Sequence, residues 1–205
     1  MASVRLTQLQ ERIKRLRLAL CPAKFSDTGD YSVEERDRVL GFRLLAHAEI
    51  EHFLEEKAQD VIVSAKKKWD LERKIGPALL NVVAFHSHAR VMSAQDFRKE
   101  FDGEKQRTQE TVTGACNAFI NSIKRNHGIK DENIFKLLLP LGVSPKQIDP
   151  TWLGNTHSFA SDRGPTAHSS AQTYQLVDPK GEVERVDKVI EGLEAIDALL
   201  EGLIA

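Results

Sequence analysis

Residues 32–69 read SVEERDRVLGFRLLAHAEIEHFLEEKAQDVIVSAKKKW, and this stretch determines the expected fold class. Ser32 and Glu35 have the spacing of a capping box, which satisfies free N–H groups at the start of a helix. Apolar residues then recur at three- and four-residue steps and keep one face for about eight turns. They are Val39, Phe42, Ala46, Ile50, Leu54, Ala58, Val61, Ala65 and Trp69. The pattern predicts a long amphipathic helix, which we expect to end at Gly76-Pro77 because proline disfavours a helix interior.

Similar spacing appears at both ends of the chain. Residues 4–20 carry one apolar face, made of Leu6, Leu9, Ile13, Leu16 and Leu20. Residues 182–203 place apolar side chains at heptad positions, namely Val186, Val189, Leu193, Ile196, Leu200 and Leu203. Between these ends we expect helices at about 78–91, 94–101, 104–125, 131–139 and 150–162, with a single turn at Ser144-Pro145. No segment has convincing strand alternation, so the chain is predicted to be an all-α bundle.

The first thirty residues differ from the remainder in charge and in pattern. The polar face of the first helix is basic and carries Arg5, Arg12, Lys14, Arg15 and Arg17. We expect this face to be solvated, with RNA binding as the alternative. Residues 21–31 contain Pro22, Asp27 and Gly29 and are predicted to form a loop. We therefore divide the chain into residues 1–30, a basic amphipathic helix with its loop, and residues 31–205, the helical bundle.

Composition limits the classes of function that fit the chain. A net charge of −1, from 29 basic and 30 acidic residues, excludes a non-specific nucleic-acid coat protein. Any contact with RNA must therefore be local. The two cysteines, Cys21 and Cys116, have no metal or disulfide pattern, and Cys116 is expected to be a buried thiol. Neither an apolar run of about 18 residues nor a signal peptide is found, so we expect no membrane contact and a cytoplasmic location.

The strongest candidate for chemistry is Arg163-Gly164-Pro165-Thr166-Ala167-His168. Arginine offers a permanent charge and a planar fork of donors that suits phosphate oxygens. Histidine exchanges protons near neutral pH, so the two residues together could cleave a phosphodiester without a metal. Pro165 disfavours a continuous helix, which places the motif at a helix break. Asp162 and Thr166 are expected to support Arg163 and His168.

Two other histidine motifs contain possible metal ligands but lack the other features of a metal site. Glu49-x-x-His52 has the spacing found in di-iron bundles, but such sites need a second copy and two further glutamates. A polar helix face with Glu51, Glu55 and Glu56 is the better interpretation. His86 and His88 would point in different directions from a helix. We therefore expect no metal and no cofactor.

Three segments together resemble the HEPN superfamily, and more narrowly its RiboL-PSP-HEPN group. They are residues 44–55 (LLAHAEIEHFLE), residues 123–143 (IKRNHGI, then FKLLLPLGV from Phe135), and residues 159–169 (FASDRGPTAHS). The likeness covers about residues 34–204 and leaves the N-terminal helix outside it. It implies a HEPN-like helical bundle that dimerises, so that two R-x4-H motifs face each other across a two-fold axis. It also implies metal-independent endoribonuclease activity, commonly in toxin–antitoxin or antiphage systems, with RNA as substrate and an antitoxin or defence protein as partner.

One position departs from the pattern of active members of this group. The residue after the motif arginine is often Asn, Asp or His, but here it is Gly164, which has no side chain to orient the histidine or contact phosphate. Two alternatives therefore stay open. One is a catalytically silent HEPN module that binds RNA, a nucleotide or a partner protein. The other is a helical interaction protein in which Arg163 caps a helix and His168 packs locally.

Overall fold

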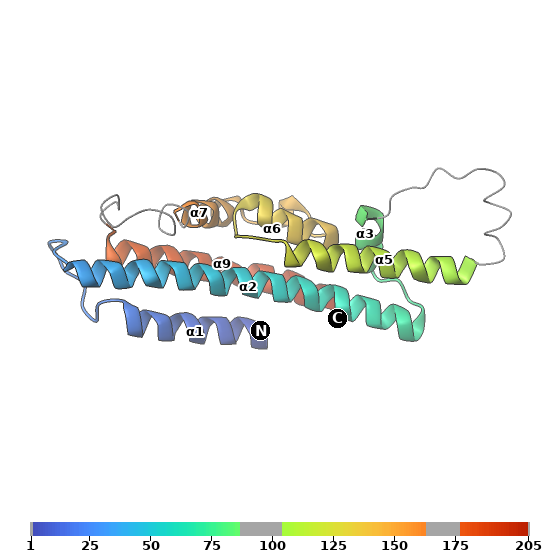
Figure 1. Cartoon of the computed structure of the whole chain (residues 1–205), viewed down its shortest axis with the longest axis horizontal. Coiled ribbons are helices and arrows are strands. Elements are labelled where there is room, and N and C mark those ends of the chain that lie inside the picture. Colours follow the sequence, from blue (N-terminus) through green and yellow to red (C-terminus); the bar gives the residue numbers. More distant parts are fainter. Residues whose placement is uncertain (1, 87–103, 163–176, 205) are drawn as a thin grey trace.

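The computed structural model describes residues 2–86, 104–162 and 177–204, and every regular element in these ranges is helical (Figure 1). The α-helices are α1 (Val4–Leu20), α2 (Val33–Glu72), α3 (Pro77–His86), α5 (Glu104–Lys124), α6 (Asp131–Leu138), α7 (Pro150–Ser161) and α9 (Pro179–Ile204). Two 3₁₀ turns, η2 (Leu139–Leu141) and η3 (Pro145–Gln147), follow α6. The prediction of an all-α bundle is confirmed.

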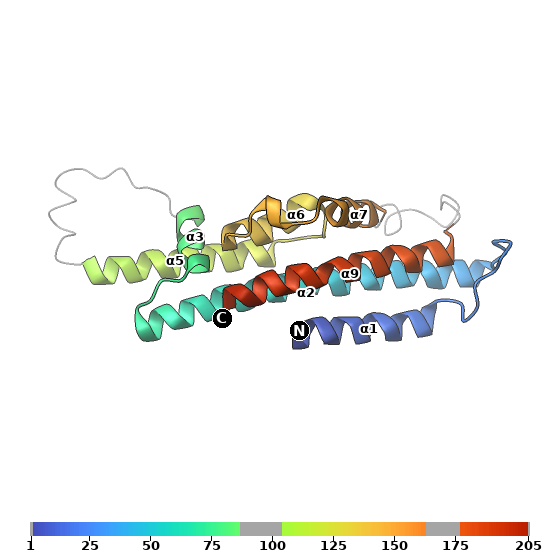
Figure 2. The ribbon, with the colours of Figure 1, turned by 180° about the vertical axis from the view of Figure 1, so that it is seen from behind.

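The bundle is organised around α2, which has 40 residues and is about 60 Å long. α1 lies along one side of α2, and α9 runs beside α2 in the same direction (Figures 1 and 2). The helices α3, α5, α6 and α7 cover the opposite side from α1. The other helices are thus arranged around α2 and α9, the two longest helices of the described residues.

The start of α2 agrees with the sequence prediction, whereas its end does not. At the start the capping box is present, because Ser32 Oγ accepts from Glu35 N and Ser32 N donates to Glu35 Oε2 at 2.8 Å. The predicted end at Gly76-Pro77 is wrong, since α2 stops at Glu72. Arg73 takes a left-handed conformation (φ 57°), its N–H bonds to Trp69 O at 2.9 Å, and its guanidinium lies over the Trp69 ring. The cation–π contact helps to hold a conformation that non-glycine residues rarely adopt.

Other helix boundaries differ from the prediction by smaller amounts. α9 begins at Pro179 rather than at residue 182, because Asp178 acts as its cap. The carboxylate of Asp178 accepts a hydrogen bond from Gly181 N at 2.9 Å, and the carbonyl of Asp178 accepts one from Glu182 N at 3.0 Å. α3 starts at Pro77 and is described as far as His86; the helix predicted at 94–101 lies outside the described residues.

Most of the buried apolar side chains form one continuous core. α1 contributes four residues, Leu6, Leu9, Ile13 and Leu16, to the same cluster that holds the apolar faces of α2, α5 and α9. Residues 4–20 therefore pack as part of the bundle core. Cys116 is fully buried, as predicted, and burial raises the pKa of its thiol.

A buried ionic cluster joins α1, α2 and α9. Lys57 of α2, which is 1% exposed, pairs with Asp197 of α9 at 2.9 Å and also with Glu201. Ser3, the cap of α1, donates to Asp197 through its N–H at 2.8 Å and its hydroxyl at 2.6 Å. Because a buried charge is costly without partners, this cluster strongly favours one arrangement of α1, α2 and α9.

Asp197 also makes stability depend on pH. Burial acts to raise its pKa, but hydrogen bonds from Ser3 and Lys57 outweigh burial and hold the pKa below its ordinary value. The stability that Asp197 contributes is therefore complete above its unfolded pKa of about 3.9, and is lost as pH falls through the lower folded value.

We predict that Asp197→Asn lowers the free energy of unfolding by about 3 kcal/mol at pH 7, because Lys57 loses its buried partner. The difference from wild type should shrink as the pH falls below about 4, as measured by urea unfolding. Asp187→Asn is the matched control, since Asp187 lies on the same helix in a half-exposed pair with Arg17. Equal effects of the two substitutions would contradict this interpretation.

Candidate functional site

The segment that leads into the predicted motif is α7, which is seated firmly on α9. Trp152 Nε1 donates to the carbonyl of Val189 in α9 at 2.9 Å. Gly192 lies against the indole, where a Cβ would sit 1.9 Å from Trp152 Cδ1. A larger residue at 192 would therefore displace the ring. Phe159, two residues before the end of α7, is fully buried.

A chain of alternating charges begins where α7 ends. Asp162 caps α7 and pairs with Arg185 of α9 at 2.8 Å. Arg185 lies 3.5 Å from Glu182, which in turn accepts two hydrogen bonds from Arg43 of α2, at 2.9 and 2.5 Å. The side chains of Arg43 and Glu182 are 9% and 2% exposed. Two parallel hydrogen bonds between a guanidinium and a carboxylate fix the distance and orientation of the two groups. This series of charged side chains therefore connects α2, α9 and the end of α7.

The same face of α2 continues with two more polar side chains. His47, one turn beyond Arg43, is buried, and its ring centroid lies 6.0 Å from that of Phe159. Its Nδ1 is 3.5 Å from Glu51 Oε2, and Glu51 also accepts a hydrogen bond from Gly128 N in the loop after α5. A polar stripe on α2 thus contacts α7 and the α5–α6 loop.

The predicted motif begins directly after Asp162, the residue that follows α7. Of the four predicted site residues, Asp162 is described, whereas Arg163, Thr166 and His168 lie outside the described residues. Arg163 follows Asp162 directly in the sequence.

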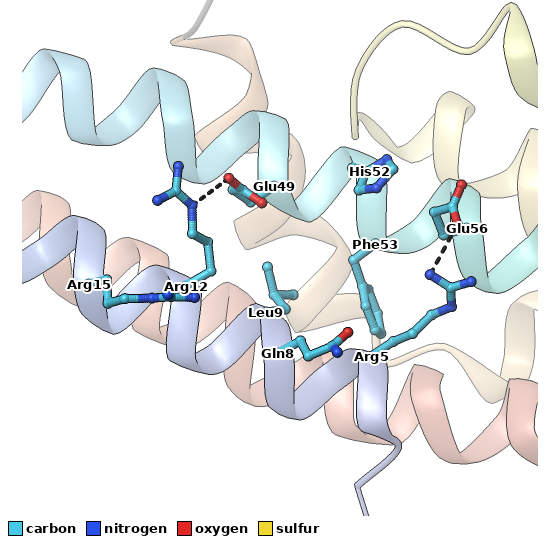
Figure 3. A pocket seen from close by; sticks show the side chains of 9 residues that line it. All are labelled: Arg5, Gln8, Leu9, Arg12, Arg15, Glu49, His52, Phe53 and Glu56. Atoms are coloured by element: carbon cyan, nitrogen blue, oxygen red, sulfur yellow. Dashed lines mark hydrogen bonds and ion pairs between the residues drawn. The ribbon is translucent and has the colours of Figure 1, made fainter.

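A second candidate is a groove between α1 and α2 with a volume of about 380 Å³ (Figure 3). In it Arg5 pairs with Glu56 at 3.0 Å and Arg12 with Glu49 at 2.8 Å, while His52 projects from α2 between the two pairs. These two arginines are therefore already neutralised by carboxylates, and Glu49 of the Glu49-x-x-His52 pattern serves as such a partner.

The basic face of α1 is accordingly different from the expected solvated surface. Besides Arg5 and Arg12, Arg17 pairs with Asp187 of α9 at 3.4 Å. Lys14 and Arg15 are exposed. Three of the five cations thus attach α1 to its neighbours, and such half-exposed pairs each contribute about 1 kcal/mol or less.

Within residues 2–86, 104–162 and 177–204, no three His, Cys, Asp or Glu side chains gather closely enough to hold a metal ion. In these same ranges, no helix has both the length and the apolar character needed to cross a bilayer. Comparison with protein-family models, with curated proteins and with solved structures found no match to the chain. What the protein does is therefore inferred from its own residues.

The sequence analysis missed the buried charged residues on α2 and α9. Arg43 and Lys57 each stand beside an apolar position of α2, so the hydrophobic periodicity concealed them. A usable signal was present, since 14 residues separate Arg43 from Lys57 and 15 separate Glu182 from Asp197. Two cations and two carboxylates at matching intervals of about four turns indicate two ion pairs between parallel helices.

We predict that Arg43→Met lowers the free energy of unfolding by about 3–5 kcal/mol, because Glu182 stays buried after losing its bidentate partner. Adding Glu182→Leu should recover most of that loss, since an apolar pair replaces an ion pair at small cost. Arg12→Met, which breaks a half-exposed pair, serves as control and should cost about 1 kcal/mol or less. Urea unfolding monitored by circular dichroism measures all three, and equal losses in the two single variants would contradict the role of Arg43.

Proposed function

We propose that the chain is a metal-independent endoribonuclease of the HEPN type, acting as a homodimer. The observation that carries the proposal is the attachment of Asp162, the residue directly before Arg163, to Arg185 of α9 at the end of α7. An arginine that holds a scissile phosphate must be placed to within a fraction of an ångström, which requires a rigid neighbour. The R-x4-H motif follows such a neighbour.

In the proposed reaction the 2′-hydroxyl of RNA attacks the adjacent phosphorus. His168 accepts the proton of that hydroxyl as general base. Arg163 stabilises the charge that develops on the non-bridging oxygens. The bond to the 5′-oxygen breaks, and that oxygen takes a proton from the same histidine of the second copy. The products are a 2′,3′-cyclic phosphate and a 5′-hydroxyl, and two-fold symmetry supplies both the base and the acid.

The resemblance also suggests a biological setting for this activity. We place the enzyme in a toxin–antitoxin or antiphage defence system, in the cytoplasm, with an antitoxin or another defence protein as its partner.

A second candidate is a HEPN module that binds RNA, a nucleotide or a partner protein without cleaving. Gly164 favours this candidate because it offers no side chain to orient His168. Asp162 is the nearest acidic residue that could compensate, but its carboxylate is paired with Arg185. The two candidates predict different results for the same variants.

Under the nuclease proposal, His168→Ala abolishes cleavage of RNA, and Arg163→Lys lowers kcat by about 100-fold because an ammonium group lacks the bidentate grip. Arg185→Ala removes the ion pair with Asp162 and should lower kcat by about 10-fold, while stability changes by about 1 kcal/mol or less because this pair is half-exposed. Arg17→Ala, which breaks a comparable pair with Asp187, is the control and should leave kcat unchanged.

Initial rates on a fluorogenic RNA, with light scattering for the oligomeric state, measure these effects. A protein that is only monomeric at tens of micromolar excludes the shared site. Wild-type protein that cuts no RNA, together with a Gly164→Asn variant that also cuts none, would support the binding module instead.

A further inference from the structure

A pocket of about 440 Å³ lies between α3, α5, α6 and the turn η2, away from the groove of Figure 3. Two aromatic rings line it, Phe85 from α3 and Phe135 from α6. Two cations also line it, Arg125 after α5 and Lys136 from α6. This volume is in the range of small-molecule sites in proteins.

Phe85 is a large aromatic residue whose side chain is exposed to solvent. Its side chain is 62% exposed, although Leu79 and Val82 of the same helix are fully buried. The ring of the next residue, His86, packs against Phe85 and against Phe119 of the core, with centroid distances of 5.8 Å in both cases. The backbone that carries Phe85 is therefore anchored while the ring itself stays accessible, as a stacking surface requires.

The two cations of this pocket differ from those of the α1–α2 groove. Arg5 and Arg12 are paired with carboxylates, whereas Arg125 and Lys136 form no ion pair with any described residue. Arg125 Nε donates to the carbonyl of Asn121 at 3.1 Å, which holds the guanidinium at the end of α5. Glu132 also lines the pocket, but it lies in the first turn of α6, where the helix dipole favours a negative charge.

We propose that this pocket binds one nucleotide of single-stranded RNA, with the base stacked on Phe85 and the adjoining phosphate near Arg125 and Lys136. The choice of RNA as ligand rests on the proposed function. An accessible ring beside two cations that form no ion pair with described residues suits a base and its phosphate, and only a base outside a duplex can reach such a ring. The site also meets the requirement that a chain of net charge −1 contact RNA locally.

The test uses the 205-residue His168→Ala protein, which is expected to bind RNA without cutting it, and a fluorescein-labelled single-stranded RNA. Phe85→Ala should weaken binding by roughly 5- to 100-fold in fluorescence anisotropy, and Phe85→Trp should retain it. Leu80→Ala is the matched control, because Leu80 is 59% exposed on the same helix but does not line the pocket. Equal losses in Phe85→Ala and Leu80→Ala would overturn the stacking role, and would indicate a general apolar surface such as a protein contact.

The phosphate contact is tested by salt dependence. Lys136→Ala should lower the slope of log Kd against log salt by about 0.7, the value for one phosphate of a single strand. Lys124→Ala removes an exposed cation of α5 that does not line the pocket and should leave the slope unchanged. Identical slopes for the Lys136→Ala variant and its parent would overturn this contact.

Cleavage by otherwise wild-type protein separates this inference from the proposed function. Phe85→Ala should raise KM by roughly 5- to 100-fold and leave kcat unchanged, because the proposed role of Phe85 is to bind a base and not to take part in the bond changes. RNA cleavage with an unaltered KM would overturn the pocket alone. RNA binding that depends on Phe85 without any cleavage would overturn the nuclease alone, and the absence of both would overturn both.

Discussion

Two buried ion pairs set the register of α2 against α9, and the positions of the other helices depend on that register. Arg43–Glu182 and Lys57–Asp197 are separated by 14 residues along α2 and by 15 along α9, about 21 and 22 Å. Because the separations nearly match, both pairs form only when the parallel helices are aligned within less than one turn. A slip of either helix would leave up to four charges buried without partners, at several kcal/mol each. α7 packs on α9 through Trp152. The position of Asp162, at the end of α7, therefore depends on the alignment of α9 with α2.

The sequence was sufficient to predict the helical class and the apolar faces, and insufficient for features that depend on contacts between helices. Periodicity alone identifies the buried faces of α1, α2 and α9, because core positions repeat at the period of the helix. The end of α2 could not be located, since Arg73 adopts its left-handed conformation through contacts with Trp69 and Gln109 of α5. The ion pairs escaped notice because charges beside an apolar stripe usually face solvent.

The candidate site also combines features that local sequence predicts with features that only the fold reveals. The motif from Arg163 to His168 comes from local sequence, and its residues lie outside the described part of the chain. The attachment of Asp162 to Arg185, and of Glu182 to Arg43, joins residues up to 139 positions apart and could be found only from the fold. Within the described part of the chain, the arginines include buried partners such as Arg43, half-exposed partners such as Arg5 and Arg12, and Arg125 beside Phe85, which forms no ion pair with a described residue.

In the proposed reaction RNA is cleaved by its own 2′-hydroxyl, with His168 transferring protons and Arg163 binding the phosphate. The chemical nature of the new RNA ends, produced in excess EDTA and resolved by mass spectrometry, distinguishes this reaction from metal-dependent hydrolysis. We expect unimpaired cleavage that leaves a 2′,3′-cyclic phosphate, or its hydrolysis product, and a 5′-hydroxyl. Cleavage that stops on chelation, returns with Mg²⁺ and leaves a 5′-phosphate would contradict it.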